Sequence, residues 1–258
     1  MQNTLEKKRI IKLGSENIIG AKLCFIAGPC SIENEDQIER IALDVASSGA
    51  TVLRGGAYKP RTSPHSFQGL GKLGYEFLHK AAKRNNLYSI SEVIDEKSLD
   101  EASSCIDILQ IGSRNMQNYS LLKAAGKTTK PVLLKRGCAA TYKELVLAAE
   151  YILTSGNPNV ILCERGIRTF EPSTRNTLDL TAVPMLHEMC DLPVVVDPSH
   201  GTGKRSLVKP LALAAAAVGA DGIMLETHYD PDNSYSDAEQ TINIAQLKDI
   251  ISAINKVI

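Results

Sequence analysis

Two sets of side chains in this 258-residue chain could carry out chemistry. The first set combines a thiol, an imidazole and two carboxylates, from Cys30, His200, Glu226 and Asp237. Such a mixed set of sulfur, nitrogen and oxygen donors accepts Mn²⁺, Fe²⁺, Co²⁺ or Zn²⁺ and discriminates poorly among them. Each residue also has an ordinary structural role, such as a buried thiol for Cys30 or a helix N-cap for Asp237. No two of them stand at a close ligand spacing, so spacing leaves both interpretations open.

The second set is cationic, and each member follows a short apolar run. It consists of Arg54, Lys59, Arg61, Arg114, Lys135 and Arg165. Arginine binds phosphate and carboxylate through two parallel hydrogen bonds, whereas lysine supplies a point charge. Because the whole chain has 29 basic and 29 acidic residues, a cluster of cations at one place indicates a multiply charged anionic ligand. The alternative is that each cation pairs with a surface carboxylate, which could hold for any one arginine but would be unusual for the whole set.

The elements that must position these residues are short β-branched apolar runs separated by amphipathic segments. We expect strands at residues 23–27, 51–54, 87–93, 107–111, 131–135, 160–163, 193–196 and 222–225. Several of these runs are continuously apolar, which is typical of parallel strands covered on both faces. Eight strand-plus-helix units in about 250 residues predict an α/β fold, a single-domain (β/α)8 barrel. The competing doubly wound sheet is less favoured, because the AGPCS turn lacks the GxGxxG spacing.

A barrel brings the two sets together, because active sites of this fold lie at the C-terminal ends of the strands. We expect residues 21–258 to form the catalytic barrel. Residues 1–20 stand outside the repeat as an N-terminal extension, and they could form a strand pair that covers the N-terminal end of the barrel.

Composition argues against several classes of partner. The balanced charge gives no support for a nucleic-acid or anionic-membrane partner. The longest apolar run, residues 211–220, is too short for a membrane span, which needs about 20 residues. The N-terminus carries charge without a following apolar stretch, so it does not read as a secretory signal. Six cysteines without a CxxC pair predict a reducing, cytoplasmic setting.

Seven segments between residues 26 and 241 also carry a family resemblance. In order, they read IAGPCSIE, LRGGAYKPRTSPHSFQGLG, QIGSRNMQN, PVLLKRG, ILCERGIRTFEPSTRNTLDL, VVVDPSHGTGKR and GIMLETHYDPDNSYSDAEQT. Together they resemble the 3-deoxy-7-phosphoheptulonate synthases, in the type I branch that consists of the barrel alone. The resemblance implies a (β/α)8 barrel that condenses phosphoenolpyruvate with erythrose 4-phosphate, releases phosphate, and requires one divalent metal ion. This reaction opens the shikimate pathway to the aromatic amino acids.

The resemblance also implies roles for individual residues. It makes Cys30, His200, Glu226 and Asp237 the metal ligands. It assigns phosphoenolpyruvate to Arg54, Lys59, Glu92, Gly112, Ser113, Arg114, Lys135 and Arg165. It assigns erythrose 4-phosphate to Lys59, Pro60, Arg61 and Thr62. Our mechanistic hypothesis is that Lys59 donates a proton to the nascent alkoxide, while Asp197 orients His200 or a water molecule.

Three other functions remain to be weighed. The related 3-deoxy-manno-octulosonate 8-phosphate synthases use the same enol donor, but their sugar-binding segment reads KANRTS, whereas this chain has KPRTS at residues 59–63. A Schiff-base aldolase would use Lys135 as its nucleophile, although a flanking arginine favours an electrostatic role. A non-catalytic sugar-phosphate binder would have no need for the four donor residues.

Three further expectations concern assembly, control and one cysteine. The resemblance implies a homo-oligomer, a dimer or a tetramer. About twenty residues precede the first expected strand, so we expect no inhibition by aromatic amino acids. We expect Cys138, just past Lys135, to be a buried filler.

Overall fold

The computed structural model describes residues 8–257 except residues 61, 62 and 64. Its strands are β1 Ile11–Leu13, β2 Glu16–Ile19, β3 Cys24–Gly28, β4 Val52–Arg54, β5 Tyr88–Val93, β6 Ile108–Ile111, β7 Val132–Lys135, β8 Val160–Glu164, β9 Val194–Val196 and β10 Gly222–Glu226. Its α-helices are α1 Glu35–Ser47, α2 Lys72–Arg84, α3 Glu96–Ser103, α4 Tyr119–Ala125, α5 Tyr142–Thr154, α6 Ala182–Met189, α7 Pro198–Thr202, α8 Arg205–Ala217 and α9 Ile244–Ile254. Two short 3₁₀ helices, η1 Ser113–Asn115 and η2 Pro231–Asn233, follow β6 and β10. Within the described residues, no helix is both long and apolar enough to traverse a membrane.

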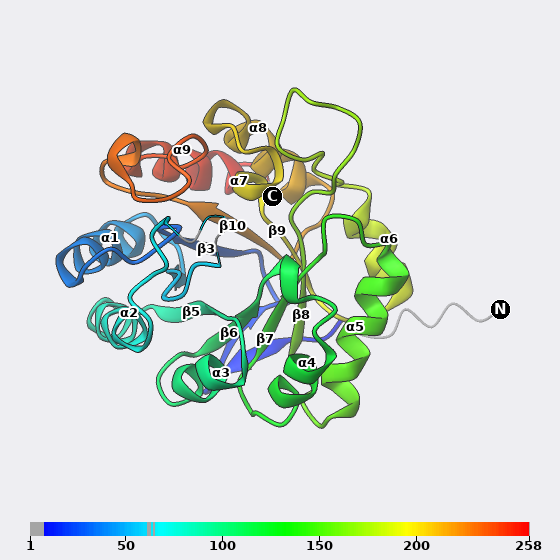
Figure 1. The fold of residues 1–258 in the computed structure, drawn as a ribbon. Helices are drawn as coiled ribbons and strands as arrows, with labels where there is room; N and C mark the ends of the chain where they lie inside the picture. Colours follow the sequence, from blue (N-terminus) through cyan, green and yellow to red (C-terminus); the bar gives the residue numbers. More distant parts are fainter. Residues whose placement is uncertain (1–7, 61–62, 64, 258) are drawn as a thin grey trace.

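Strands β3 to β10 form a closed barrel in the order β10-β3-β4-β5-β6-β7-β8-β9. Every neighbouring pair is parallel, and helices surround the strands as a ring (Figure 1). The predicted (β/α)8 barrel is therefore confirmed. The strands are buried along almost their whole length, as the continuously apolar runs indicate.

The side chains of the barrel alternate between two apolar layers because strand side chains point alternately to opposite faces. In β7, Val132 and Leu134 pack outward against the helices. Leu133 lies between them and belongs to a second cluster, made of the apolar residues that point into the barrel. The barrel interior is therefore a packed core over its N-terminal half.

The antiparallel pair β1–β2 belongs to this interior cluster. Its Ile11, Ile18 and Ile19 are buried against inward residues of the barrel strands, such as Ile26 and Ile108. The hairpin therefore adds apolar side chains to the interior cluster of the barrel.

Capping side chains fix where several helices begin. They thereby fix the length of the loops that join the C-terminal ends of the strands to these helices. Asn34 accepts a hydrogen bond from Gln37 N at the start of α1, while Asp95 and Thr141 form capping boxes on α3 and α5. Gly28 is the last residue of β3 before the loop to α1, and its φ of 148° suits glycine. A Cβ on Gly28 would also collide with the carbonyl oxygen of Arg54, so glycine permits the close approach of β3 and β4 just before Cys30.

Candidate active site

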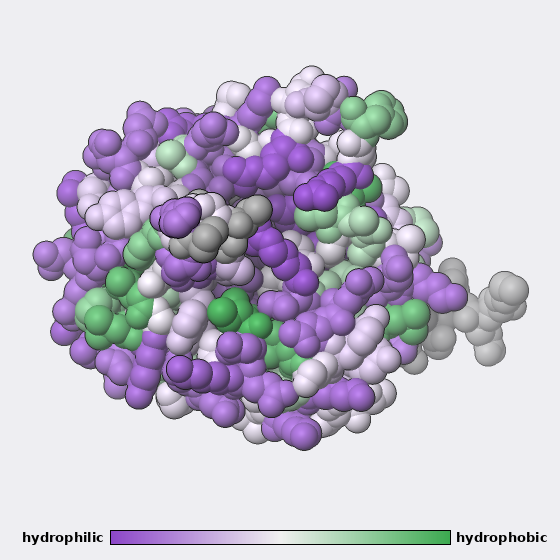
Figure 2. Space-filling model, in the orientation of Figure 1, coloured by the Kyte–Doolittle hydropathy of each residue, from purple (hydrophilic) through white to green (hydrophobic). Residues whose placement is uncertain are grey.

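The C-terminal mouth of the barrel contains a cavity of about 690 Å³. Among the residues expected from the sequence, it is lined by Arg54, Lys59, Pro60, Glu92, Gly112, Ser113, Arg114, Lys135, Arg165, His200 and Asp237. Cys30 and Glu226 are buried and contact two of these lining residues, Lys59 and Arg54. The predicted donor set and the predicted cationic set therefore meet in one place. Figure 2, in the orientation of Figure 1, shows a largely hydrophilic surface on the visible face of the molecule.

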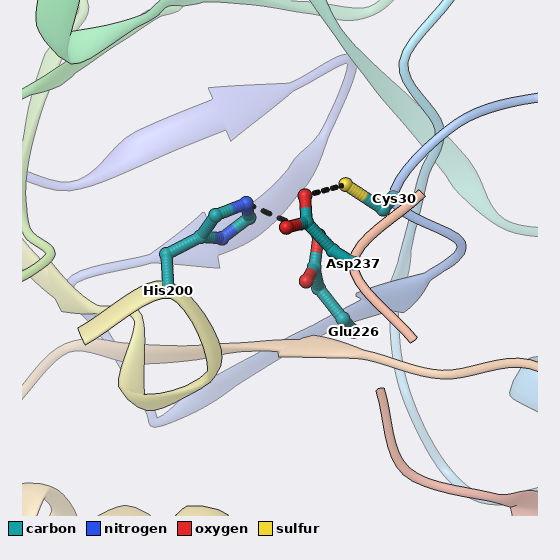
Figure 3. Close-up of side chains that lie close together, drawn as sticks. All are labelled: Cys30, His200, Glu226 and Asp237. Atoms are coloured by element: carbon teal, nitrogen blue, oxygen red, sulfur yellow. Dashed lines mark hydrogen bonds and ion pairs between the residues drawn. The ribbon is translucent and has the colours of Figure 1, made fainter. Parts of the chain in front are cut away.

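The four donor residues converge from four separate segments, as Figure 3 shows. Cys30 follows β3, His200 lies in α7, Glu226 ends β10, and Asp237 lies in the loop beyond. One ligand atom from each of them lies within 4.8 Å of all the others. The Cys30 Sγ donates to Asp237 Oδ2 at 2.8 Å, and His200 Nε2 lies 3.2 Å from Glu226 Oε1. One sulfur, one nitrogen and two oxygens at this spacing fit a single divalent cation of the transition series.

The orientation of His200 is set by Asp197, which is fully buried. Asp197 Oδ1 accepts the backbone N–H of His200 at 3.0 Å, and its Oδ2 lies 2.8 Å from His200 Nδ1. Because Nδ1 is engaged in this contact, Nε2 is the ring nitrogen that faces the donor set. The ammonium group of Lys135 lies 2.6 Å from the same Oδ2, so Asp197 connects an inward cation to the imidazole.

The electrostatics of the donor set suit a metal site. Burial, with the Glu226 carboxylate nearby, raises the pKa of the Cys30 thiol to about 12, so coordination of a cation would release its proton. Burial lowers the pKa of His200 despite the adjacent Asp197 and Glu226, which favours the neutral imidazole that metals bind. Burial alone would raise the pKa of Asp237, but the hydrogen bond from Cys30 and the nearby charges of Lys59 and Arg175 hold it far below its usual range.

The thiol and the two carboxylates of the donor set each contact the side chain of one lysine or arginine. The Arg54 Nη1 lies 2.7 Å from Glu226 Oε1, and the Lys59 ammonium lies 2.9 Å from Cys30 Sγ. Asp237 Oδ1 is 3.0 Å from Arg175 Nη1. The alternative that these cations pair with surface carboxylates is wrong for Arg54 and Lys135, because their partners Glu226 and Asp197 are buried within the site.

A second part of the cavity has cations without such partners. Arg165 is buried and donates to Cys138 Sγ and to the carbonyl oxygen of Gly166, both at 3.4 Å. The exposed Arg114 donates to the carbonyl oxygen of Pro60 at 3.0 Å. Within the described residues, no ion pair links either guanidinium to a carboxylate. Guanidinium groups that face a cavity without a carboxylate are suited to bind an anion.

Glu92 is the acidic group on this side of the cavity. Its Oε2 accepts a hydrogen bond from Gln110 Nε2 at 3.3 Å. A Cβ on Gly112 would collide with the Glu92 carboxylate, so the absence of a side chain at residue 112 lets this acid lie beside the start of η1.

The expected tetrose segment is described only in part. Lys59, Pro60 and Ser63 line the cavity, whereas Arg61 and Thr62 lie outside the described residues. The expectation that Cys138 is a buried filler is wrong: it is half-buried, lines the cavity and accepts the hydrogen bond from Arg165. The N-cap interpretation of Asp237 is also wrong, because residues 238–240 form a turn and not an α-helix.

Sequence reasoning did not single out three side chains that contact the donor set. Besides Arg175, these are Asn176, whose Nδ2 donates to the carbonyl oxygen of His200 at 3.3 Å, and Gln240, whose Nε2 donates to Glu226 Oε2 at 2.7 Å. All three lie within the resembling segments, in TRN at residues 174–176 and AEQT at residues 238–241, and this was the only signal for them. They follow no strand end directly, so the barrel pattern does not select them.

Arg136, the neighbour of Lys135, has a different environment. It is buried between two carboxylates, with its Nη1 2.8 Å from Glu164 Oε2 and 2.9 Å from Asp179 Oδ2. Glu164 Oε1 in turn accepts the backbone N–H of Gly166 at 2.6 Å. This network links the end of β7 to the end of β8 and to the loop before α6. It therefore supports the segment that carries Arg165.

Comparison with known proteins agrees with this geometry. The family model described as the DAHP synthetase I family matches residues 7–257. The chain belongs to the DAHP synthetase I family. A curated relative from Thermotoga maritima, phospho-2-dehydro-3-deoxyheptonate aldolase, is 49% identical over 247 residues, which cover 96% of this chain and 73% of the relative.

Two solved structures support the same placement, and a differently named relative is less similar. A crystal structure of phospho-2-dehydro-3-deoxyheptonate aldolase (DAHP synthase) from Thermotoga maritima matches with a TM-score of 0.94 and 48% identity, over 97% of this chain and 74% of that chain. A truncated form of 3-deoxy-D-arabino-heptulosonate 7-phosphate synthase from the same organism gives a TM-score of 0.91 and 44% identity, over 97% and 92%. A 2-dehydro-3-deoxyphosphooctonate aldolase from Desulfosudis oleivorans is only 30% identical, over 91% of this chain and 90% of the relative.

Proposed function

We propose that this chain condenses phosphoenolpyruvate, D-erythrose 4-phosphate and water to 3-deoxy-D-arabino-heptulosonate 7-phosphate and phosphate. The reaction is the first step of the shikimate pathway. One observation carries the proposal: four donor residues suited to a divalent cation adjoin guanidinium groups that face the same cavity without carboxylate partners. The 49% identity to a named DAHP synthase supports it further.

The cations of the cavity suit the charge of the substrates. Each phosphate monoester carries about 1.5 to 2 negative charges at neutral pH, and phosphoenolpyruvate adds a carboxylate. Arg114 and Arg165 hold the phosphate of phosphoenolpyruvate, together with the backbone at residues 112–113. Arg54, Lys59 and Lys135 contact the acidic groups of the site, and they direct the carboxylate and the enol carbon. Fixing both substrates in this way lowers the entropic part of the barrier.

The carbon–carbon bond forms between C3 of phosphoenolpyruvate and the aldehyde carbon of the tetrose. Lys59 lies beside Cys30 in the cavity, and its ammonium group protonates the oxygen of the former aldehyde. Burial alone would lower the pKa of Lys59, but the nearby Cys30 and Glu226 raise it, which keeps the group protonated. Water then adds to C2 and loses one proton. The C2–O bond to the phosphate breaks as the new C2 hydroxyl passes its remaining proton to the departing phosphate, which leaves the ketone.

Cys30, His200, Glu226 and Asp237 are the residues that would hold the metal ion, whether Mn²⁺, Fe²⁺, Co²⁺ or Zn²⁺. When bound, such an ion supplies Lewis acidity to an aldehyde oxygen or to a water molecule. Asp197 keeps the His200 ring in the orientation that directs Nε2 toward the other donors.

Two alternatives are less well supported. The Lys135 amine is engaged by the buried carboxylate of Asp197 at 2.6 Å, which opposes its use as a Schiff-base nucleophile. The octulosonate synthases are more distant in sequence. Side-by-side assays with erythrose 4-phosphate and arabinose 5-phosphate test this choice. We expect turnover with the tetrose, and preferential turnover of the pentose would refute the proposal.

Replacement of Lys59 by methionine tests the proton-donor role. We expect kcat to fall by about 10²- to 10⁴-fold, because general acid catalysis contributes that much. Metal content should remain equal to that of the unaltered protein. Lys209, which pairs with Asp249 at the surface, provides the control substitution Lys209→Met, which should leave kcat unchanged. Near-normal turnover of Lys59→Met removes Lys59 from the mechanism.

The remaining expectations concern organisation. We propose that the expected extension at residues 1–20 closes the N-terminal end of a catalytic barrel at 21–258; this proposal rests on residues 8–20, because residues 1–7 lie outside the described part of the chain. We also propose that the protein works as a dimer or tetramer in the cytoplasm. The hairpin β1–β2 and the six cysteines, all free thiols, support the extension and the reducing setting. Light scattering coupled to size-exclusion chromatography measures the oligomeric state, and a monomer would contradict the proposal.

A further inference from the structure

Gln240 is a fully buried side chain in the loop that also carries Asp237. Its Nε2 donates to Glu226 Oε2 at 2.7 Å. Glu226 is itself fully buried, so this hydrogen bond is shielded from solvent. A donor on a buried carboxylate fixes the plane of that carboxylate as well as satisfying one of its oxygens.

The two oxygens of Glu226 have different partners. Oε1 contacts Arg54 Nη1 at 2.7 Å and His200 Nε2 at 3.2 Å, which places it on the side of the donor set. Oε2 contacts Gln240 instead. The backbone N–H of Glu226 donates to Ser199 Oγ at 3.0 Å, which fixes the main chain from which the side chain extends. The carboxylate is therefore held with Oε1 toward the other donor residues, while Oε2 is occupied by the hydrogen bond from Gln240.

In the part of the chain that the structure describes, the amide oxygen of Gln240 is unsatisfied, which lowers the stability of the folded protein. Within the described residues, Gln240 Oε1 is buried and has no hydrogen-bond partner. An unsatisfied buried acceptor costs about 1–3 kcal/mol. Turning the amide over would relieve nothing, because it would place the oxygen against the Glu226 carboxylate. An apolar side chain of similar size would avoid this cost, so the amide is better explained by its contact with Glu226 than by packing.

The loop around Gln240 is fixed independently of this contact. The Thr241 N–H donates to the Asp237 carbonyl at 3.2 Å and closes a turn over residues 237–241. Arg205 holds the same turn, with its side chain donating to the carbonyl oxygens of Ala238 at 2.8 Å and Thr241 at 2.5 Å. The hydrogen bond between Gln240 and Glu226 therefore joins two donor residues that come from different segments, Glu226 at the end of β10 and Asp237 in this turn.

We propose that Gln240 is a positioning residue of the metal centre: it holds Oε2 of Glu226 so that the carboxylate offers Oε1 alone to the cation. The inference rests on the proposed function in so far as the four donors bind a metal. It adds that the carboxylate binds through one oxygen and that a neutral amide outside the donor set controls this binding mode.

Substitution of Gln240 by methionine removes the donor and keeps nearly the same length. Titration of Co²⁺ into chelator-stripped protein by calorimetry should show a dissociation constant about 10- to 100-fold weaker than that of the unaltered protein, the range for loss of a hydrogen bond to a metal ligand. The absorption spectrum of bound Co²⁺ should change as well, because its ligand geometry changes.

Gln110 supplies a matched control on the opposite side of the cavity. Its Nε2 also donates to a glutamate, Glu92 Oε2, at 3.3 Å, but Glu92 is not one of the four donors. Gln110→Met should leave Co²⁺ affinity and spectrum unchanged. A Gln240→Met affinity within twofold of the unaltered protein, or an equal loss in both variants, would overturn the inference.

A second measurement does not depend on a variant that folds. A crystal structure of the unaltered protein with Mn²⁺ should show Glu226 binding through Oε1 alone, with Gln240 still on Oε2. Binding through both oxygens would overturn the inference while leaving the proposed reaction intact. If the unaltered protein binds no Co²⁺, or if Cys30→Ser binds it as tightly, the assignment of the metal site fails together with the role of Gln240.

Discussion

The two ends of the barrel interior differ in chemistry although the same strands build both. At the N-terminal end, Ile11 and Ile19 of the hairpin pack against inward residues such as Ile161, and all three are fully buried. At the C-terminal end, acids and cations contact one another beside an open cavity. The first arrangement stabilises the fold through apolar burial, whereas the second holds charges that contribute little to folding but can bind ligands.

Along a barrel strand, the inward side chains change from apolar to polar within two residues. Because strand side chains alternate, inward positions are two residues apart. The inward pairs are Val52 and Arg54 in β4, Ile90 and Glu92 in β5, Ile108 and Gln110 in β6, and Leu133 and Lys135 in β7, with Val195 followed by Asp197 after β9 and Met224 by Glu226 in β10. In these six strands, the inward position at or just after the C-terminal end carries a polar side chain of the site, and the inward position before it belongs to the apolar core.

The largest expected effects come from replacing two arginines at adjacent strand ends, Arg165 and Arg136, of which one should affect substrate binding and the other stability. Arg165→Met should raise the KM for phosphoenolpyruvate about 100-fold, since a charge-assisted hydrogen bond to phosphate contributes about 3 kcal/mol. Arg136→Met should lower the free energy of unfolding by about 3–5 kcal/mol, because Glu164 and Asp179 would keep buried charges without a partner. Steady-state kinetics and urea denaturation measure the two effects, and the reverse pattern would contradict the division of roles.

At the other end of the barrel, Ile19→Ala should affect stability and not catalysis. Removal of a fully buried isoleucine costs about 2–5 kcal/mol in unfolding free energy. The kcat and KM of the folded enzyme should stay unchanged. Leu43→Ala, at an exposed position on α1, is the control and should cost less than about 0.5 kcal/mol. A large fall in kcat for Ile19→Ala would show that the two ends are coupled.

Asp221 allows a pH test at the N-terminal end. Burial alone would raise its pKa, but hydrogen bonds from His187, Lys8 and the backbone of Val194 outweigh burial and lower it. A lowered pKa means that the folded state favours the ionised form, so the stabilisation is present above the ordinary pKa of about 4 and is lost as the pH falls further. Asp221→Asn should therefore cost about 2 kcal/mol at pH 7, with the difference from the unaltered protein vanishing at acidic pH. Urea denaturation between pH 7 and pH 3 measures this, and a gap that widens with acidity would contradict the prediction.

The smallest expected effect concerns two arginines of the loop between β8 and α6. Arg175 contacts the donor residue Asp237, whereas Arg168 lines the same cavity with no ion pair to a donor residue in the described part of the chain. Each methionine substitution removes one positive charge from the cavity, so the difference in Co²⁺ affinity between the two variants reports the contact of Arg175 with Asp237. Because a partly exposed ion pair contributes about 0.2–1 kcal/mol, Co²⁺ should bind about two- to fivefold more weakly to Arg175→Met than to Arg168→Met. Equal affinities would assign Arg175 no positioning role.

The sequence predicts the barrel and most of the cavity because both follow local patterns. Continuously apolar runs mark the strands, and polar residues directly after them mark the mouth. The pairing of those polar residues could not be read from the pattern, since Arg54 meets Glu226 and Lys135 meets Asp197 across long stretches of chain. Likewise, nothing in the KR dipeptide at residues 135–136 indicates that one cation faces the cavity and the other lies between Glu164 and Asp179.

The apolar hairpin contact has a kinetic consequence for a condensing enzyme. With the interior filled at the hairpin end, reactants enter and products leave through the same opening. If Arg114 and Arg165 hold the enol ester as proposed, departing phosphate must pass the same arginines. Inorganic phosphate should accordingly compete with the enol ester for the free enzyme. The rate of product release should then depend on the cationic residues at the mouth of the cavity as well as on the residues that act in the reaction.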